Sequence, residues 1–255
     1  MTAAAAALET VGLSRSFGGI RATDGVSLRL ERGGRHALIG PNGAGKTTLV
    51  NLLTGVLRPS AGRILLDGED IAGLRPDRRA ARGLARTFQV NQLFPAMTPL
   101  EAVALAVAQR RGDGGRWWRA LGRLPSVADE AAAILDRFGL GGDAMGERVS
   151  GLPYGRQRLL EIALAVACRP RVLLLDEPAA GVPEAERDGI LSAVAALAGE
   201  VTVLLIEHDM DIVFRFADRI SVLVAGALLT EGTPAEVAED PRVRAVYLGE
   251  TDGHA

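Results

Sequence analysis

The sequence predicts an α/β fold in which helices cover a mainly parallel sheet. In the second half of the chain, helical apolar spacing alternates with short apolar runs from Leu159 onward. Such alternation is typical of parallel strands joined by helices, and continuous apolar runs indicate strands that are buried on both faces. A third observation is the Gly-x-x-x-x-Gly-Lys-Thr segment at residues 40–47, which lies between a strand pattern and a helix pattern.

The first part of the chain, to about Leu66, is predicted to contain several strands and one helix. Short alternating or apolar runs are separated there by glycines and charged turns, and one helical pattern interrupts them. We expect strands at 26–30, 36–39 and 63–66, and a helix at 47–53.

The middle of the chain is predicted to be a mostly helical insert. Between about Gln89 and Leu152, apolar residues recur at helical spacing, with breaks rich in glycine and arginine at 111–116 and 139–142. The residues at this spacing are Leu100, Val103, Leu105 and Val107, followed by Val127, Ala131, Ile134, Leu135 and Phe138.

Helices and strands are expected to alternate in the last part of the chain. No linker rich in proline or serine separates the three parts, which indicates that they are subdomains of one unit. We expect helices to Ala167, at 184–197 and at 210–216, and strands at 172–175, 201–206 and 220–224.

The composition limits the classes of partner and site. The 255 residues include 29 basic and 31 acidic side chains, a net charge of −2, so no field of the whole molecule attracts nucleic acid or lipid. Cys168 is the single cysteine, beside three histidines, which excludes an internal disulfide and a zinc cluster and fits a reducing compartment. We expect neither a secretory signal nor a membrane-spanning helix, which needs about 20 apolar residues.

Residues 40–47 are predicted to bind phosphate. Phosphate oxygens need several backbone N–H donors, glycines let the chain wrap closely enough to present them, and the dipole of the following helix favours negative charge. Lys46 is expected to reach the β- and γ-phosphates and the Thr47 hydroxyl to ligate Mg²⁺. Lys46 is also the only lysine of the chain, whose other basic residues are arginine. The expected nucleotide-binding residues here are Gly40, Pro41, Asn42, Gly43, Ala44, Gly45, Lys46, Thr47 and Thr48.

Two carboxylates follow the apolar run at 172–175. Asp176 is expected to hold Mg²⁺ directly or through water, and Glu177 is placed to polarise a water for in-line attack on the γ-phosphate. An adjacent acidic pair at a strand end is also compatible with a solvated turn. The phosphate-binding segment favours the metal and catalytic roles.

His208 and Gln89 are further candidates. His208 follows the strand pattern at 201–206, at the sheet edge where ligands bind in α/β folds, and it is able to donate to the γ-phosphate. Gln89 lies where the strand-rich part meets the helical insert, and its amide is able to touch Mg²⁺ or the attacking water. The alternatives are a structural histidine and a solvated amide, and the residues alone leave both open.

The chain resembles the ATP-binding subunit of ABC transporters in the order and spacing of five features, namely the segments at 40–47, 152–156 and 176–177, Gln89 and His208. The resemblance covers nearly the whole chain. Shorter segments are similar to the branched-chain amino acid importer branch, and to the longer of its two kinds of ATP-binding subunit. These segments lie within 86–98, 154–163, 176–181, 206–210 and 231–234, and in the tail through 240–249.

The resemblance implies a P-loop NTPase core of the RecA-like type, with an antiparallel β subdomain and a helical ABC subdomain. The implied arrangement is one ABC ATPase domain over 1–255, with the core and β subdomain in 1–88 and 159–255 and the helical subdomain in 89–158. Phe17 takes the aromatic position that stacks on adenine, although the residue alone indicates a core aromatic. The implied catalytic residues are Lys46, Gln89, Glu177 and His208, and the implied metal ligands are Thr47, Gln89 and Asp176.

The signature segment departs from the family pattern. The family usually has Leu-Ser-Gly-Gly-Gln where this chain has Leu152-Pro153-Tyr154-Gly155-Arg156. Pro153 removes a hydroxyl and an N–H that in the family contact the γ-phosphate on the opposite subunit, so Tyr154 and Gly155 are expected to make a weakened contact. Pro183 stands at the usual D-loop aspartate, so communication between the two sites is expected to differ.

The resemblance implies an ATPase that couples ATP hydrolysis to transport, with two subunits paired head to tail around two ATPs. The implied partners are membrane permease subunits, a second copy or a paralogue of the chain, and indirectly a periplasmic or extracellular solute-binding protein. Nucleic acid is not among the implied partners. The implied location is peripheral, on the cytoplasmic face of the cell membrane. The cargo is expected to be branched-chain amino acids, with another small polar solute of amide or urea type as the alternative. A soluble ABC ATPase or a non-hydrolysing scaffold is less favoured, because the chain has a single cassette and carries Glu177.

Overall fold

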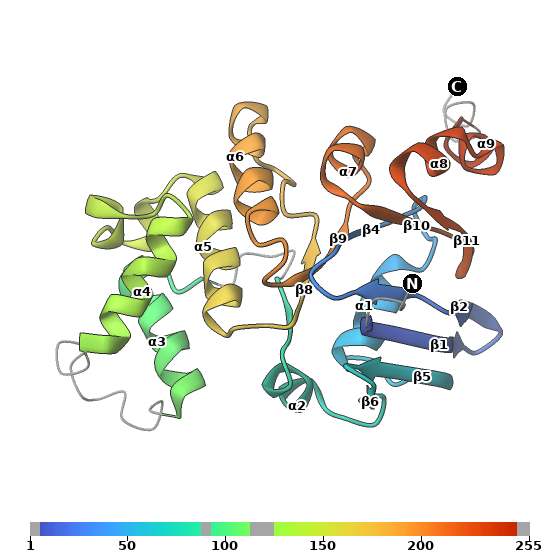
Figure 1. The fold of residues 1–255 in the computed structure, drawn as a ribbon, viewed down its shortest axis with the longest axis horizontal. Coiled ribbons are helices and arrows are strands. Elements are labelled where there is room, and N and C mark those ends of the chain that lie inside the picture. The colour runs from blue at the N-terminus through green and yellow to red at the C-terminus, as the bar shows by residue number, and fades with distance from the viewer. Residues whose placement is uncertain (1–5, 88–92, 113–124, 249–255) are drawn as a thin grey trace. The chain divides into compact units, whose positions relative to one another are not determined.

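The computed structural model describes residues 6–87, 93–112 and 125–248. The chain divides into two compact units. The first unit contains residues 1–86, 171–177 and 198–255, and the second contains residues 87–170 and 178–197. We describe each unit by itself (Figure 1).

A six-stranded sheet forms the centre of the first unit, in the order β11-β10-β4-β9-β8-β7. All neighbouring strands are parallel except β10 and β11, which confirms the mainly parallel sheet predicted from the continuous apolar runs. The strands are β4 (Arg35–Ile39), β7 (Leu84–Arg86), β8 (Val172–Asp176), β9 (Thr202–Ile206), β10 (Arg219–Val224) and β11 (Ala227–Gly232).

The first unit also contains an antiparallel sheet built around β1 (Ala6–Phe17), which pairs with β2, β3 and β5. The strand predicted at 26–30 is divided, because β2 ends at Val26 and β3 begins at Arg29. The Thr10 hydroxyl fills this break, since it accepts from Leu28 N at 2.8 Å and donates to Val26 O at 3.0 Å. The other strands of this sheet are β2 (Ile20–Val26), β3 (Arg29–Glu31), β5 (Ala61–Leu66) and β6 (Glu69–Asp70).

One apolar core joins the two sheets of the first unit. It includes residues of β1, β4, β8 and β9 together with the apolar face of α1 (Lys46–Thr54). The predicted helix at 47–53 lies within α1, and the helix predicted at 210–216 is α7 (Met210–Phe216). The remaining helices of this unit are α2 (Pro76–Ala81), α8 (Pro234–Glu239) and α9 (Pro241–Leu248).

The second unit is helical in its described residues, as predicted for the middle of the chain. Its first helix begins at a capping box, in which the Thr98 hydroxyl accepts from Glu101 N and the Glu101 carboxylate accepts from Thr98 N. The resemblance implies a helical subdomain over 89–158, and the compact unit that contains these residues spans 87–170 and 178–197. Its helices are α3 (Pro99–Arg111), α4 (Pro125–Arg137), α5 (Tyr154–Ala167) and α6 (Glu184–Ala195), with 3-10 turns η3 (Gly142–Met145) and η4 (Val149–Gly151).

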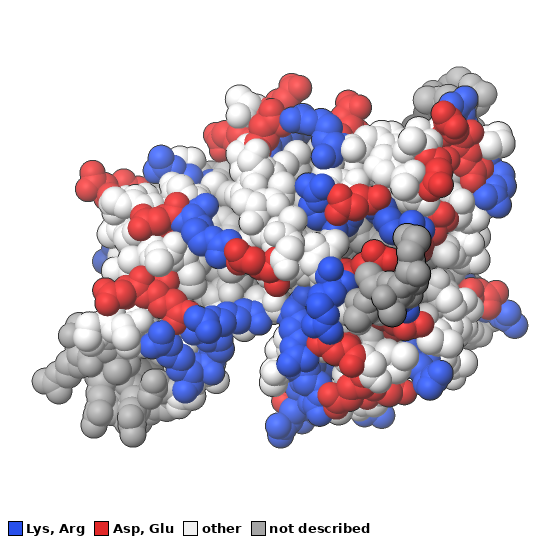
Figure 2. Space-filling view, in the orientation of Figure 1, with Lys and Arg blue, Asp and Glu red and all other residues white. Residues whose placement is uncertain are grey.

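The surface carries charges of both signs. Figure 2 shows acidic and basic side chains interspersed over the face that it draws. Across the described ranges, no helix is long and apolar enough to cross a bilayer.

Arg79 is a buried cation that closes the end of α1. Its side chain is 1% exposed, and its guanidinium donates to the carbonyls of Leu52 and Leu53, each at 2.6 Å, at the last turn of the helix. It also donates to Leu74 O at 3.0 Å and Ala72 O at 2.8 Å. Burial lowers the pKa of Arg79, because it disfavours the charged form. The hydrogen bonds to these four carbonyls offset part of the free-energy cost of burying the charge.

We expect Arg79→Ala to lower the free energy of unfolding by roughly 2 to 4 kcal/mol, because it removes the guanidinium donor from four carbonyls, of which Leu52 O keeps a 3.3 Å bond from Gly55 N. Chemical denaturation measures this loss. Arg78→Ala is the matched control, since that side chain is 72% exposed on the same helix and should change stability by less than about 0.5 kcal/mol. Equal losses in the two variants would contradict the role of Arg79.

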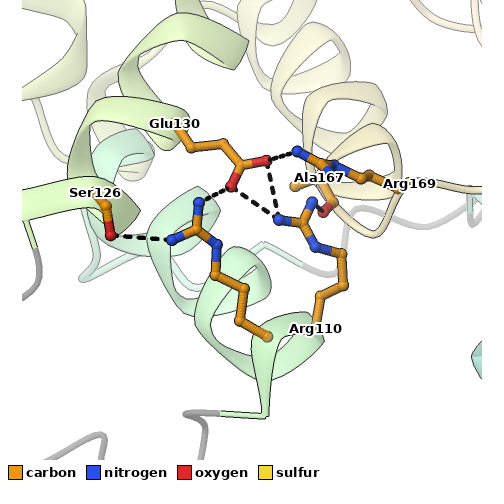
Figure 3. A network of polar contacts seen from close by, with 6 residues as sticks. Arg110, Ser126, Glu130, Ala167 and Arg169 are labelled. Atoms are coloured by element: carbon orange, nitrogen blue, oxygen red, sulfur yellow. Dashed lines mark hydrogen bonds and ion pairs between the residues drawn. The ribbon is translucent and has the colours of Figure 1, made fainter.

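Three arginines converge on Glu130 in the second unit (Figure 3). Arg110 and Arg111 of α3 and Arg169, which follows α5, donate to the two carboxylate oxygens of Glu130 at 2.5 to 2.9 Å. Arg110 also donates to Ala167 O at 2.8 Å, so the network ties together α3, α4 and the end of α5. Burial alone would raise the pKa of Glu130, but the three arginine hydrogen bonds outweigh it and lower the pKa to about 2.

Because the pKa of Glu130 is lower in the folded chain than in an unfolded one, its contribution to stability is present above about pH 4.5 and is lost as the pH falls towards 2. We expect Glu130→Gln to lower the melting temperature at pH 7 and to flatten its fall between pH 4.5 and 2. Thermal unfolding followed by circular dichroism across this range tests both effects. Asp129→Asn, an exposed position on the same helix, should leave the pH profile unchanged.

Candidate active site

Residues 40–47 form the connection between β4 and α1. Gly40 and Gly45 have φ angles of 152° and 99°, which side-chain-bearing residues rarely adopt. A Cβ atom on Gly40 would lie 2.1 Å from Leu223 O, and one on Gly45 would lie 2.3 Å from Ala22 O. The N-terminus of α1 has no side-chain cap, so its first N–H groups suit an anionic ligand.

The Lys46 ammonium lies against this loop. It donates to Gly40 O at 2.5 Å and to Pro41 O at 3.0 Å. The only lysine of the chain therefore places its charge inside the loop that the sequence predicts to bind phosphate. A side chain with three donors on a flexible stem is able to exchange such contacts for phosphate oxygens.

The other predicted residues of the first unit follow neighbouring strands. In the sheet, β9 lies between β4 and β8, and all three strands are parallel. Asp176 ends β8 and is followed by Glu177, whereas His208 comes two residues after the end of β9. Because parallel strands end at the same edge of a sheet, the loop, the two acids and the histidine share one edge.

Glu177 and His208 are in direct contact. His208 Nδ1 lies 3.3 Å from Glu177 Oε1, and Glu177 N donates to Ile206 O of β9 at 2.9 Å. Glu177 has a φ of 46°, a left-handed conformation that costs free energy in a residue other than glycine. A hydrogen bond to β9 therefore holds the Glu177 backbone in a strained conformation while its carboxylate lies beside the histidine, and such strain is common at catalytic sites.

Asp176 is buried next to an arginine that the sequence did not single out. The Arg86 guanidinium donates to Asp176 Oδ2 at 2.7 Å, and the two side chains are 13% and 7% exposed. A carboxylate and the Thr47 hydroxyl are hard oxygen donors of the kind that Mg²⁺ prefers. These two oxygen donors therefore fit the metal that the sequence predicts.

Glu207 is a second residue that the sequence did not single out. It is 2% exposed, its Oε2 accepts from His208 N at 3.2 Å, and burial raises its pKa. In the described part of the chain, Oε1 of Glu207 is buried without a hydrogen-bond partner. The only sequence signal for Glu207 is its position directly before His208.

Phe17 lies at the end of β1 in the hairpin with β2. Its side chain is 44% exposed, so it is not the core aromatic that the residue alone indicates. The Arg15 guanidinium lies over the ring, 4.7 Å from its centroid. Because Ala22 of β2 approaches Gly45, the hairpin that carries Phe17 packs against the phosphate loop.

The signature residues are in the second unit. α5 begins at Tyr154, and Pro153 precedes it with a φ of −53° and without a side-chain cap for the helix. A Cβ atom on Gly155 would lie 2.0 Å from Glu186 Oε2 of α6, so an acidic side chain lies against the signature glycine. Gln89 lies outside the described residues.

A family model described as ABC transporter matches residues 23–180. This chain belongs to the ABC transporter family. A second model, described as branched-chain amino acid ATP-binding cassette transporter, matches residues 227–253 of the ABC protein.

Two curated relatives match the ABC protein over nearly its full length. It is 44% identical over 253 residues to the high-affinity branched-chain amino acid transport ATP-binding protein BraF of Pseudomonas aeruginosa. The alignment covers 95% of this chain and 98% of the relative. It is 41% identical over 252 residues to the corresponding protein LivG of Escherichia coli, with coverage of 95% and 98%.

Solved structures support the same fold. The ADP conformation of an ATP-binding cassette of an ABC transporter matches with a TM-score of 0.82 at 31% identity, over 96% of this chain and 99% of that one. A nucleotide-free cassette matches with a TM-score of 0.82 at 30% identity, over 95% of this chain and 98% of that one. The P-loop NTPase fold with its antiparallel sheet and helical part is thereby confirmed for the ABC protein, as is nucleotide binding by its family.

Proposed function

We propose that this ABC protein binds ATP with Mg²⁺ and hydrolyses it to drive an importer of branched-chain amino acids. The observation that supports this chemistry most directly is the shared sheet edge, where the Lys46 loop, the acidic pair and His208 follow β4, β8 and β9. A phosphate-binding loop beside a carboxylate and a histidine supplies the groups that phosphoryl transfer to water requires.

The residues of the site divide the chemistry among them. Lys46 binds the β- and γ-phosphate oxygens, and the N–H groups of the loop and of the α1 N-terminus bind the others. Glu177 orients the attacking water and accepts its proton. His208 orients the Glu177 carboxylate through the 3.3 Å contact with Nδ1, which leaves Nε2 for the γ-phosphate. Phe17, backed by Arg15, stacks on the adenine.

The metal site of the proposal consists of oxygen donors. The Thr47 hydroxyl, the Asp176 carboxylate and the Gln89 amide would hold Mg²⁺, with water and phosphate oxygens as the further ligands. When bound, the ion neutralises charge on the β- and γ-phosphates.

A second ATP-binding subunit completes each site in this proposal. Tyr154 and Gly155 at the start of α5 contact the γ-phosphate held by the opposite subunit, and Pro153 weakens this contact because it has neither the hydroxyl nor the N–H of the usual serine. Permease subunits anchor the pair to the cytoplasmic face of the membrane, and a solute-binding protein delivers the cargo.

Reconstitution of the whole transporter tests the proposal. The chain, its co-encoded permease subunits and its partner ATPase are placed in proteoliposomes that contain ATP, and uptake of labelled leucine is measured with the solute-binding protein present. We expect uptake together with ATP hydrolysis that leucine stimulates. Uptake of urea or an amide in place of leucine would support the alternative cargo, and a complex that consumes no ATP would contradict the proposed chemistry.

A further inference from the structure

Arg86 connects the two parts of the first unit that carry the proposed metal ligands. Its guanidinium donates to Asp176 Oδ2 at 2.7 Å and to Asn51 Oδ1 at 2.9 Å. Asn51 belongs to α1, the helix that begins at Lys46 and Thr47, and Asp176 is the last residue of β8. One side chain therefore bridges the helix of the phosphate loop and the carboxylate proposed to hold the metal.

The guanidinium of Arg86 and a cation bound at Asp176 would compete for the same carboxylate. Both side chains are largely buried, and charges in such a site interact several-fold more strongly than in water, because the effective dielectric constant is about 20 rather than about 80. A guanidinium beside Asp176 shares the negative charge that Mg²⁺ needs, and two cations on one carboxylate repel each other. Metal binding at Asp176 therefore has to weaken the contact with Arg86.

Arg86 is also the last residue of the first segment of the first unit, since the second unit begins at Thr87. The side chain that holds Asp176 thus belongs to the residue at which the chain passes from one unit to the other.

We propose that Arg86 is a positioning residue that competes with Mg²⁺ for the carboxylate of Asp176, and so sets how much Mg²⁺ the nucleotide site requires. The proposal rests on the proposed function, in which Asp176 holds the metal. It assigns Arg86 no contact with the substrate.

The test is the Mg²⁺ dependence of nucleotide binding, measured with a non-hydrolysable ATP analogue by calorimetry from EDTA to excess Mg²⁺. Mg²⁺ should raise the affinity for the analogue, and the Mg²⁺ concentration that gives half of this increase is the measured quantity. We expect Arg86→Gln to lower that concentration by about tenfold, because the competing charge is gone. Arg86→Lys keeps the charge but lacks the planar fork that bridges Asn51 and Asp176, so its Mg²⁺ requirement should lie between those of Arg86→Gln and the wild type. Arg82→Gln, which removes a partly exposed arginine paired with Glu69, is the matched control and should also stay near the wild type.

An unchanged or raised Mg²⁺ requirement in Arg86→Gln would overturn the inference. A wild-type protein that binds no ATP analogue would instead contradict the proposed function, so the two failures are distinguishable. If Arg86→Gln does not fold, Asn51→Ala provides the same test, since it removes a second anchor of the guanidinium and should lower the Mg²⁺ requirement by a smaller factor.

A double-mutant cycle without metal tests the pairing itself. In EDTA, Arg86→Gln should lower the melting temperature because it leaves the Asp176 carboxylate buried without its cation. In the Asp176→Asn background the same change should cost much less. Equal costs in both backgrounds would show that the two side chains do not interact, and would overturn the competition.

Discussion

Lys46→Ala should weaken ATP binding by roughly 100-fold or more and abolish measurable hydrolysis. The ammonium is the only cation within the loop at 40–47, and hydrogen bonds from a charged donor are worth about 1.5 to 3 kcal/mol each. Two such contacts to the β- and γ-phosphates account for an effect of this size. Calorimetry with ATP and a phosphate-release assay measure the two losses.

Lys46→Arg is the informative control for this variant. It keeps the positive charge, but its planar fork does not match a pocket that accommodates a compact ammonium between Gly40 O and Pro41 O. We therefore expect it to restore little binding. ATP affinity and turnover that are unchanged in Lys46→Ala would refute the phosphate site, provided that thermal unfolding shows the variant to be folded.

Glu177→Gln should reduce ATP turnover by about 100-fold or more while ATP binding is kept. The amide retains the size of the side chain and the backbone contact with Ile206, but it cannot accept a proton from water. Since ATP then persists between two subunits, a dimer should accumulate in ATP and not in ADP. Size-exclusion chromatography with light scattering detects this dimer.

Glu184→Gln provides the comparison for Glu177→Gln. Glu184 is an exposed acid in the first turn of α6, and its replacement should leave both turnover and oligomeric state as in the wild type. Normal hydrolysis in Glu177→Gln would count against its role as the base. The same result would mean that a group other than Glu177, near His208, activates the water.

The parallel sheet could be predicted from the sequence because its strands are buried on both faces. The runs at 172–175 and 201–206 became β8 and β9 with ends that differ by one residue, and the loop at 40–47 marked the junction of β4 and α1. Since ligand groups in this class of fold follow the strand ends, the predicted acids and His208 came together without further information.

The remaining elements gave weaker patterns. β1 is half exposed and has register shifts against all three partners, so its alternation is broken, and β7 has only three residues. Short strands of this kind depend on their neighbours rather than on their own residues.

Partner choice among arginines could not be predicted either. Every basic residue except Lys46 is an arginine, so nothing in the sequence distinguished the ones that bind Asp176, Glu130 or the end of α1. The contacts of Arg86 and the burial of Glu207 depend on strands distant in the chain. The roles of Gln89, Phe17 and the signature residues stay predictions.

The order of the strands in the six-stranded sheet has a consequence for biosynthesis. β4 lies between β9 and β10, both of which come from the last quarter of the chain. A ribosome therefore releases β4 and the phosphate loop long before either neighbour has been made, and an apolar strand with two open edges is prone to wrong association. Until translation has nearly ended, this part of the nascent polypeptide has neither of its neighbours in the sheet.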